Sequence, residues 1–239
     1  MKKSIVLVHG AWMDASVWYK VTPWLEQQGF EVIAVNLPGH GSDTTPFDKI
    51  TMDTYVDAVK TAIGDREKVI LAGHSMAGMV ISAVAEQIPS RIGRLVYIAA
   101  YLPQNGESLY QISQQDKDSH IGQFWRQDDP DHYSPAYIAA EGIAECFAAD
   151  APLEDIQRLV DRHKADALGP MVAPVALSDA HFGALPKTYI CTKKDNAVSY
   201  NLQQWMTQRT KVDSILDLDT SHSPFFSAPE QLARMIAGA

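Results

Sequence analysis

The sequence predicts an α/β protein with a doubly wound, mostly parallel sheet of six strands and a mainly helical cap insertion. Short apolar runs alternate along the chain with segments of helical periodicity, which is typical of strand–helix repeats. Most of these runs are apolar throughout, as expected of parallel strands that helices cover on both faces. The alternation stops after Ala100 and resumes at Lys187. This interruption predicts an inserted segment between the fourth and fifth strands.

The first expected strand lies at the start of the sequence. It follows Met1–Lys3 and is too short for the apolar part of a secretory signal peptide. No apolar stretch approaches the roughly 18 residues of a membrane-spanning helix. The six predicted strands are Ser4–Val8, Glu31–Asn36, Lys68–Ala72, Arg94–Ala100, Lys187–Thr192 and Ser214–Asp217.

Helix signals fill the spaces between the strands. Thr51 precedes apolar residues at helical spacing, and Gly64 ends that run. Pro23 interrupts another helical pattern and predicts a helix that starts late or kinks. Ser227 and Glu230 have the spacing of a capping box for the last helix.

The inserted segment differs in character from the rest of the chain. We expect residues 1–102 and 187–239 to form the core, and residues 103–186 to form a cap over the carboxyl edge of the sheet. No convincing strand pattern occurs in the cap, and Asp150 is expected to cap a helix with Pro152 in its first turn. An irregular connection is the alternative. The aromatic residues of this segment include Phe124, Trp125, Tyr133, Tyr137 and Phe147.

Charge and composition narrow the classes of partner. The chain has 29 acidic and 20 basic residues and a formal net charge of −9, which argues against nucleic acid and anionic membranes as partners. The two cysteines, Cys146 and Cys191, lack the spacing of a zinc site or a disulfide framework. We therefore expect no metal, no cofactor and a cytoplasmic location.

A strand-to-helix turn at Ser75 carries the sharpest chemical signal. The residues GHSMA at 73–77 place a small residue two positions before and two positions after the serine. Only small side chains fit around such a turn, which presents the serine oxygen at the carboxyl edge of the sheet. Ala77 stands where this pattern usually has a second glycine, a mild departure. The alternative is a serine that only caps the helix expected over Met76–Ile88.

A serine becomes a good nucleophile only when a base takes its proton. Of the eight histidines, His222 follows the last strand in a loop that opens at the carboxyl edge. His40 lies in a glycine-rich turn that we interpret as structural, and the His74 side chain is expected to point away from Ser75. A solvated loop histidine is the alternative for His222.

The base needs an acid that fixes its tautomer and supports the imidazolium. Asp195 follows the fifth strand at the same edge of the sheet and is expected to orient His222. Asp217 and Asp219 are rivals, since they are closer to the histidine along the chain. They lie on or beside its own strand, where the backbone path makes facing Nδ1 harder.

Two backbone N–H groups are needed to hold an oxyanion. One is expected from Met76, directly after the serine, and the other from Ala11 in the loop after the first strand. Gly10 allows the backbone of that loop to approach closely.

Over its whole length the sequence resembles the α/β-hydrolases. Within that superfamily it looks like the branch of plant salicylate methylesterases, (S)-hydroxynitrile lyases and bacterial esterases that include pyrethroid hydrolases. The order Ser75, Asp195, His222 is that of the α/β-hydrolase catalytic triad. The resemblance rests on VLVHGAW followed by a second tryptophan at 6–18, KVILAGHSMAGMV at 68–80, LVYIAAYLP at 95–103, TYICTKKD at 188–195 and SHSPFFSAPEQLA at 221–233.

The lyases of this branch carry a threonine directly after the first-strand histidine and a lysine directly after the catalytic histidine. This sequence has Gly10 and Ser223 there, so a leaving cyanide lacks its countercharge. The resemblance implies a cofactor-free serine hydrolase that cleaves small lipophilic carboxylic esters, including methyl esters or lactones, through an acyl-enzyme. Two alternatives stay open: a hydroxynitrile lyase or other carbon–carbon lyase, and a non-catalytic receptor for a small ligand.

Aromatic residues of the cap and of the loops near the serine are expected to line the substrate pocket. Together with the acidic surface they favour a neutral, lipophilic small-molecule ester as the partner. The oligomeric state is open, with a homodimer as one expectation. The expected lining residues are Trp12, Phe124, Trp125, Phe147 and Phe225.

Overall fold

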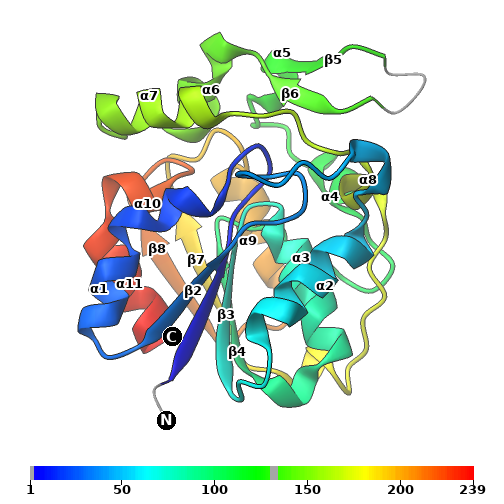
Figure 1. Ribbon diagram of the computed structural model, residues 1–239, viewed down its shortest axis with the longest axis vertical. Helices are drawn as coiled ribbons and strands as arrows, with labels where there is room; N and C mark the ends of the chain where they lie inside the picture. Colours follow the sequence, from blue (N-terminus) through cyan, green and yellow to red (C-terminus); the bar gives the residue numbers. More distant parts are fainter. Residues whose placement is uncertain (1–2, 130–133) are drawn as a thin grey trace.

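A six-stranded sheet forms the centre of the molecule (Figure 1). The structure is a computed structural model that describes residues 3–129 and 134–239. The strand order of the sheet is β2-β1-β3-β4-β7-β8, and every neighbouring pair is parallel. The predicted six-stranded α/β sheet is confirmed, with strand ends that shift by at most two residues. The strands are β1 Ser4–Val8, β2 Glu31–Val35, β3 Val69–His74, β4 Ile92–Ile98, β7 Lys187–Thr192 and β8 Ser214–Leu218.

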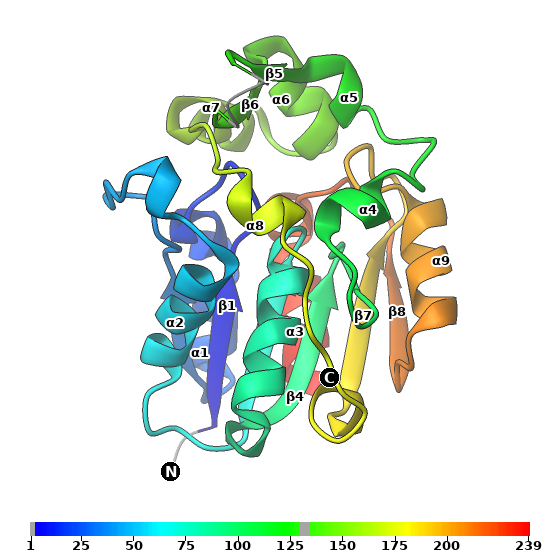
Figure 2. The same ribbon diagram turned by 90° about the vertical axis from the view of Figure 1, so that its right-hand side faces the viewer.

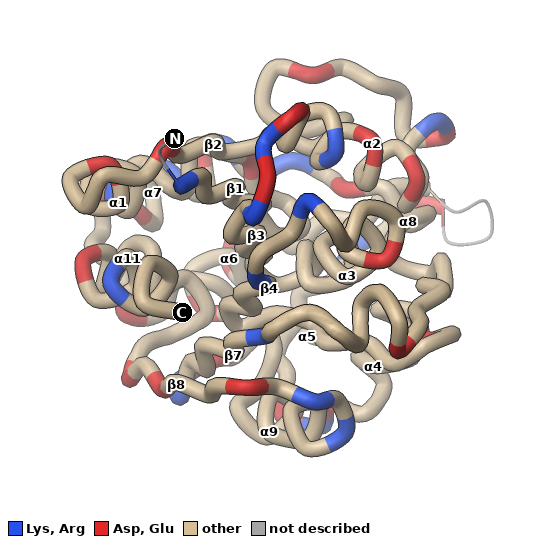
Figure 3. The backbone as a smooth tube through the Cα atoms, turned by 90° about the horizontal axis from the view of Figure 1, so that it is seen from below, with Lys and Arg blue, Asp and Glu red and all other residues tan. Residues whose placement is uncertain are grey.

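Helices cover both faces of this sheet, which explains the uniformly apolar central strands. Figure 3 shows α1 and α11 on one face and α2, α3 and α9 on the other. All residues of β1, β3 and β7 are buried, whereas the edge strand β8 alternates between less and more exposed positions. These helices are α1 Thr22–Gln27, α2 Met52–Ile63, α3 Ala77–Gln87, α9 Tyr200–Arg209 and α11 Pro229–Gly238.

Several helix ends follow the sequence signals. Thr51 caps α2 in a capping box with Thr54, and Gly64 ends that helix with a positive φ of 56°. Helix α1 begins at Thr22, with Pro23 in its first turn, where the missing N–H of proline has no helical partner to lose. The late start predicted from Pro23 is therefore confirmed.

The capping box predicted at Ser227 is wrong. Ser227 ends the short helix α10 (Pro224–Ser227), and α11 begins with Pro229 after Ala228, without a side-chain cap. Two prolines set the starts of two helices here, because proline fixes the backbone angle φ that a first helical turn needs. Ser227 and Glu230 therefore lie in two different helices and cannot form a capping box.

Most of the segment 103–186, with its helices, lies above the carboxyl ends of the strands, whereas the stretch after α8 (Gly169–Val172) runs back past α3 to the opposite end of the sheet (Figures 1 and 2). The helices of this segment are α4 Leu109–Ser113, α5 Ile121–Phe124, α6 Ala140–Phe147, α7 Leu153–Arg162 and α8 Gly169–Val172. We call this segment the cap; its status as a separate domain stays a prediction. The described residues also form short 3₁₀ helices, which are η1 Ala15–Lys20, η2 Phe47–Lys49, η3 Pro89–Arg91 and η5 Phe182–Ala184.

The expectation that the cap contains no strand is wrong. Strands β5 (Trp125–Gln127) and β6 (Ala136–Ile138) pair antiparallel over three residues each. Strands this short carry too few residues to show an alternation in the sequence. Tyr133, one of the aromatic residues noted above, lies outside the described residues.

The cap helix α7 also starts differently from the prediction. It begins after Pro152 with no side-chain cap, and the carboxylate of Asp150 instead accepts hydrogen bonds from the backbone and the hydroxyl of Ser221. The expected capping role of Asp150 is therefore wrong. Its carboxylate connects the cap to the loop that carries His222.

Within residues 3–129 and 134–239, no helix combines the length and the apolar character needed to cross a membrane. The same residues contain no group of three or more histidine, cysteine, aspartate or glutamate side chains arranged to hold a metal ion.

Candidate active site

Ser75 sits on the tight turn between β3 and α3. Its φ is 55°, a left-handed value that is uncommon for residues other than glycine. A side chain on Gly73 would place its Cβ 2.8 Å from the carbonyl oxygen of Ala77, so position 73 must be glycine for the turn to close. Ser75 is half-buried and lines a cavity at the carboxyl edge of the sheet.

His222 and Asp195 face each other in the same region. The distance from His222 Nδ1 to Asp195 Oδ2 is 2.8 Å, and both side chains are fully buried. The alternative of a solvated loop histidine is therefore wrong. The carboxylate accepts from Nδ1, which fixes the tautomer and leaves the Nε2 lone pair available. Nε2 is buried and has no hydrogen-bond partner among the described residues.

Core residues hold the Asp195 carboxylate in place. Its Oδ1 accepts from the backbone N–H groups of Ala197 and Val198, each at 2.8 Å. Its Oδ2 accepts from Thr192 Oγ1 at 2.7 Å and from Gln203 Nε2 at 3.2 Å, besides the histidine. These hydrogen-bond donors compensate the cost of burying the Asp195 carboxylate.

The rival carboxylates lie elsewhere. Asp217 pairs with Lys193 at 3.2 Å, and Asp219 pairs with Lys194 at 2.8 Å. Both aspartates are exposed, so their charges are balanced by surface lysines rather than by the histidine.

His74 contacts His222 in a way that the sequence did not indicate. Its Nε2 donates to the backbone carbonyl of His222 at 2.8 Å, and the two rings lie 4.5 Å apart. Burial, reinforced by the neighbouring His222, holds the pKa of His74 well below its usual range, so the ring is neutral. This buried imidazole supports the loop that carries His222. The only sequence signal for this role was the position of His74 next to Ser75.

The loop after β1 approaches Ser75 from the other side. A Cβ on Gly10 would lie 2.8 Å from the Ser75 Cβ, so only glycine permits this approach. Ala11 and Met76 line the same cavity as Ser75. Among the described residues, no acceptor receives the backbone N–H of either one. The two predicted oxyanion donors are thus placed beside the serine with free N–H groups.

The cavity that contains Ser75 has a volume of about 940 Å³ and lies between the sheet edge and the cap. Three of the five aromatic residues expected to line it do so: Trp12, Trp125 and Phe147. The rings of Trp125 and Phe147 lie 5.8 Å and 5.7 Å from that of Trp12. They form an aromatic wall next to the loop that carries Ala11.

The other two aromatic residues are not among the described residues that line the cavity, so their assignment to the pocket is wrong. The Phe124 ring occupies the space above Gly142, where a Cβ would be 2.1 Å from its Cγ. Phe225 is fully buried and packs against Trp18 and His74 at ring distances of 5.2 Å and 5.0 Å. Each ring fills a packing gap that the sequence could not reveal.

Ser223 is also fully buried, and its hydroxyl has no partner within the part of the chain that the structure describes. It is therefore not a solvated loop residue. A lysine at this position would have to bury its charge beside His222.

Comparison with known proteins shows the family of the chain. The sequence profile of the alpha/beta hydrolase family matches residues 5–235. The chain belongs to that family. Methylesterase 2 of Arabidopsis thaliana is 28% identical over 249 residues, which cover 97% of this chain and 94% of the relative. Methylesterase 8 of the same plant is 28% identical over 240 residues, covering 98% and 88%.

Solved structures show the same fold in the family. Polyneuridine aldehyde esterase superposes with a TM-score of 0.89 at 22% identity and covers 100% of this chain and 99% of its own. The pyrethroid hydrolase PytH superposes with a TM-score of 0.86 at 24% identity, covering 100% and 97%. The chain therefore shares its overall fold with both structures.

Proposed function

We propose that the protein is a serine hydrolase that cleaves small lipophilic carboxylic esters through an acyl-enzyme. The chain is a carboxylic ester hydrolase, in keeping with its family and with its methylesterase and esterase relatives. The finer proposal rests on one observation. His222 is held by Asp195 through Nδ1 alone, and its buried Nε2 has no partner among the described residues.

In the first half of the reaction, Ser75 Oγ attacks the acyl carbon while His222 Nε2 takes its proton. The tetrahedral oxyanion accepts from the N–H groups of Ala11 and Met76. His222 then gives the proton to the leaving alkoxide, and the alcohol departs. The acyl group remains bonded to Ser75.

In the second half, water attacks the acyl-enzyme. His222 takes a proton from the water, the same oxyanion donors hold the second tetrahedral intermediate, and the carboxylic acid leaves as Ser75 Oγ regains its proton. Asp195 stays ionised and supports the imidazolium in both halves. No step in this sequence requires a metal or an organic cofactor.

The cavity supports the substrate class. Its aromatic wall and the neighbouring aliphatic side chains suit an uncharged, lipophilic ester, and its volume is near the upper end for small-molecule sites. Methyl esters are candidate substrates of this class, and the relatives named methylesterases favour them. Lactones use the same attack and the same oxyanion. The aliphatic members of the lining include Leu109, Ile121, Leu168, Met171, Val172 and Val198.

A panel of p-nitrophenyl esters, methyl esters and lactones tests the proposal, with Ser75→Ala as the control. Wild-type turnover of the esters that is abolished in the variant is the expected result. Turnover of mandelonitrile at a rate comparable to the best ester would contradict it and favour a lyase. Tight binding of a ligand without turnover of any member of the panel would favour a receptor.

A further inference from the structure

A fully buried carboxylate of the cap, Asp166, contacts the loop that carries Ala11. Its Oδ2 accepts from the backbone N–H of Trp12 at 2.9 Å and from His40 Nε2 at 3.1 Å. Its Oδ1 accepts from Tyr55 Oη at 3.0 Å and from the backbone N–H of Ala167 at 2.8 Å. Asp166 has no exposed surface, and one cap residue thereby joins three separate segments of the core.

The same part of the cap also holds the Trp12 side chain. The backbone of Asp166 pairs with that of Ala136 through two hydrogen bonds of 3.0 Å and 2.8 Å. The carbonyl of Ala136 in turn accepts from Trp12 Nε1 at 2.9 Å. Both the backbone and the indole of Trp12 are thus bonded to one short segment of paired chain in the cap.

Trp12 needs this support, because its backbone is strained. Its φ is 61°, in the left-handed region that costs of order 1–3 kcal/mol for a residue other than glycine. Gly10, two residues earlier, gives the loop conformational freedom rather than rigidity. The direction of the Ala11 N–H therefore depends on contacts from outside the loop.

We propose that Asp166 is a positioning residue for the oxyanion hole: supported by His40 and Tyr55, it holds Trp12 and thereby aims the Ala11 N–H. The inference rests on the proposed serine esterase function. It assigns a task in the reaction to the cap, which closes over the pocket and also sets the geometry of a donor beneath it.

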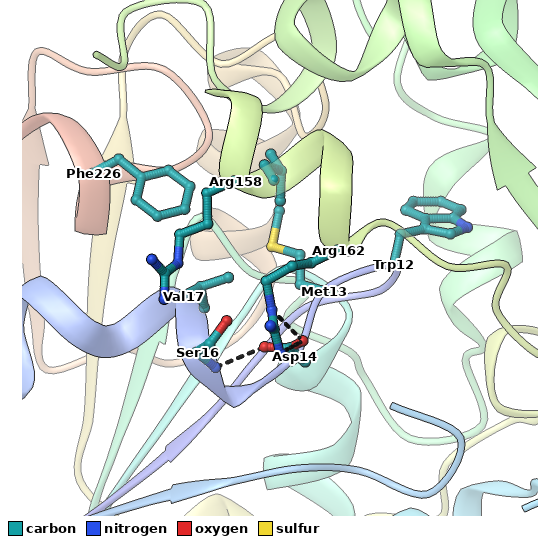
Figure 4. Close-up of a pocket in the computed structure, with 9 residues that line it drawn as sticks. Trp12, Met13, Asp14, Ser16, Val17, Arg158, Arg162 and Phe226 are labelled. Atoms are coloured by element: carbon teal, nitrogen blue, oxygen red, sulfur yellow. Dashed lines mark hydrogen bonds and ion pairs between the residues drawn. The ribbon is translucent and has the colours of Figure 1, made fainter. Parts of the chain in front are cut away.

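Figure 4 shows a second contact of the cap with the same loop. Arg162 of α7 points at Asp14, with Nη2 and Nε 2.7 Å and 2.9 Å from Asp14 Oδ2. Asp14 also accepts from the backbone N–H of Ser16 and so caps η1. Between α7 and the loop there is room for little more than a water molecule, about 10 Å³. The cap thus holds the loop at Trp12 and again at Asp14.

His40 pairs with Asp166 as a cation. Its Nδ1 faces the carbonyl of Pro38 at 3.0 Å and its Nε2 faces the carboxylate, so both nitrogens must carry protons to donate. Burial lowers the pKa of His40, but the hydrogen bond and charge of Asp166 outweigh it and leave that pKa raised. The neighbouring His9 is neutral, because burial and the charge of His40 lower its pKa to about 3.

Such a buried pair is a costly way to gain stability. Two desolvated charges often stabilise a fold no more than well-packed apolar residues of similar volume do. What charged groups add is direction, since hydrogen bonds to a carboxylate fix the donors in space. This distinction separates a positioning role from a merely structural one.

The cap contains a matched control, Asp155 of α7. It is also fully buried and also reaches the core, where it accepts from Tyr19 Oη at 2.7 Å and lies 2.5 Å from Lys20 Nζ. Like Asp166, it therefore pairs with one tyrosine and one cation, but its partners lie in η1 rather than at Ala11 or Trp12.

The experiment compares Asp166→Asn with Asp155→Asn in the full chain. Both substitutions should lower Tm, since each breaks a buried pair. Only Asp166→Asn should lower kcat, by roughly 10- to 100-fold with little change in KM, as expected for a displaced oxyanion donor. A trifluoromethyl ketone, whose alkoxide occupies the oxyanion hole, should bind Asp166→Asn more weakly by a similar factor and Asp155→Asn as wild type.

A milder variant and an activity-independent readout complete the test. Tyr55→Phe removes one donor to Asp166 and should lower kcat by a smaller factor than Asp166→Asn. Hydrogen exchange of the Trp12 amide should accelerate in Asp166→Asn but not in Asp155→Asn. Wild-type kcat in folded Asp166→Asn, or an unchanged Trp12 amide, would overturn the inference. A wild-type protein without esterase turnover would instead overturn the proposed function, and hydrogen exchange would then decide the inference alone.

Discussion

Two buried aspartate–histidine pairs lie on opposite sides of Ser75, and they differ in what the second ring nitrogen meets. In the pair of Asp195 and His222, one nitrogen contacts the carboxylate and the other has no partner among the described residues. In the pair of Asp166 and His40, the second nitrogen faces a backbone carbonyl.

This difference separates a base from a structural cation. A histidine with one nitrogen occupied keeps a lone pair that can accept a proton, whereas a histidine between two acceptors must already hold both protons. Distance and burial do not make the distinction, since the pairs measure 2.8 Å and 3.1 Å and both histidines are buried. The partner of the second nitrogen decides which pair can do proton chemistry.

The largest effect should come from the pair that we assign to proton transfer. Ser75→Ala and His222→Ala should each lower kcat by on the order of 10³–10⁶ while the fold survives. The double variant should lose little more than either single one, because the two residues act as a unit. Steady-state kinetics and thermal melts measure both quantities. Losses that multiply in the double variant would speak against a shared role.

The next largest effect concerns the carboxylates near His222. Asp195→Asn should lower kcat by about 10²–10⁴, since the amide no longer holds the correct tautomer. Asp219→Asn is the matched control, because Asp219 pairs with an exposed lysine, and it should keep wild-type kcat. The reverse result in the same assay would transfer the acid role to Asp219.

A third comparison addresses the close approach at Gly10. Gly10→Ala should lower kcat by about 10- to 100-fold, since its Cβ would lie 2.8 Å from the Cβ of Ser75 and would move the loop. Gly93→Ala meets an equally close contact, 2.8 Å from the carbonyl oxygen of Lys68, but at the opposite end of the sheet. It should lower Tm and leave kcat unchanged. Equal loss of kcat in both would mean that Gly10 matters only for folding.

The smallest effect is the pH dependence of the structural pair. Because the folded-state pKa of His40 is raised, its contribution to stability is fully present below the unfolded-state value near 6.5 and is lost as pH rises through the folded-state value. The pKa of Asp166 is lowered, since its donors outweigh the effect of burial, so its contribution is lost only in acid.

The difference in unfolding free energy between wild type and His40→Gln should therefore shrink as the pH rises from 6 to 9. The pKa of Lys20 is also raised, as the hydrogen bond and charge of Asp155 outweigh the effect of burial. For Lys20→Gln the corresponding difference should accordingly stay constant over this range. Urea unfolding across the pH series measures both. A flat profile for His40→Gln would contradict a cationic His40.

Local signals account for most of what could be predicted from the sequence. The strands, the turn at Ser75 and the helix that ends at Gly64 depend on residues within a few positions of each other. Asp195 and His222 are 27 residues apart, but each directly follows a strand, and parallel strands end at one edge of the sheet. The contact between Asp195 and His222 could therefore be predicted from the order of the strands.

The contacts that could not be predicted join the cap to the core. Asp166 meets His40 across 126 residues and Trp12 across 154, and Asp150 meets Ser221 across 71. No strand end or helix period marks these positions, because they depend on how the cap folds over the sheet. The prediction that Phe124 and Phe225 line the pocket was wrong because a phenylalanine suits a pocket wall and a packed interior equally well.

Covalent labelling of the nucleophile tests the central claim most directly. A fluorophosphonate should add one phosphonyl group to the peptide that contains Ser75, located by peptide mass spectrometry, and block ester turnover in proportion. Ser75→Ala should remain unlabelled, and His222→Ala should label far more slowly. Ester turnover by a wild-type protein whose Ser75 stays unmodified, or labelling at another residue that abolishes turnover, would contradict the account.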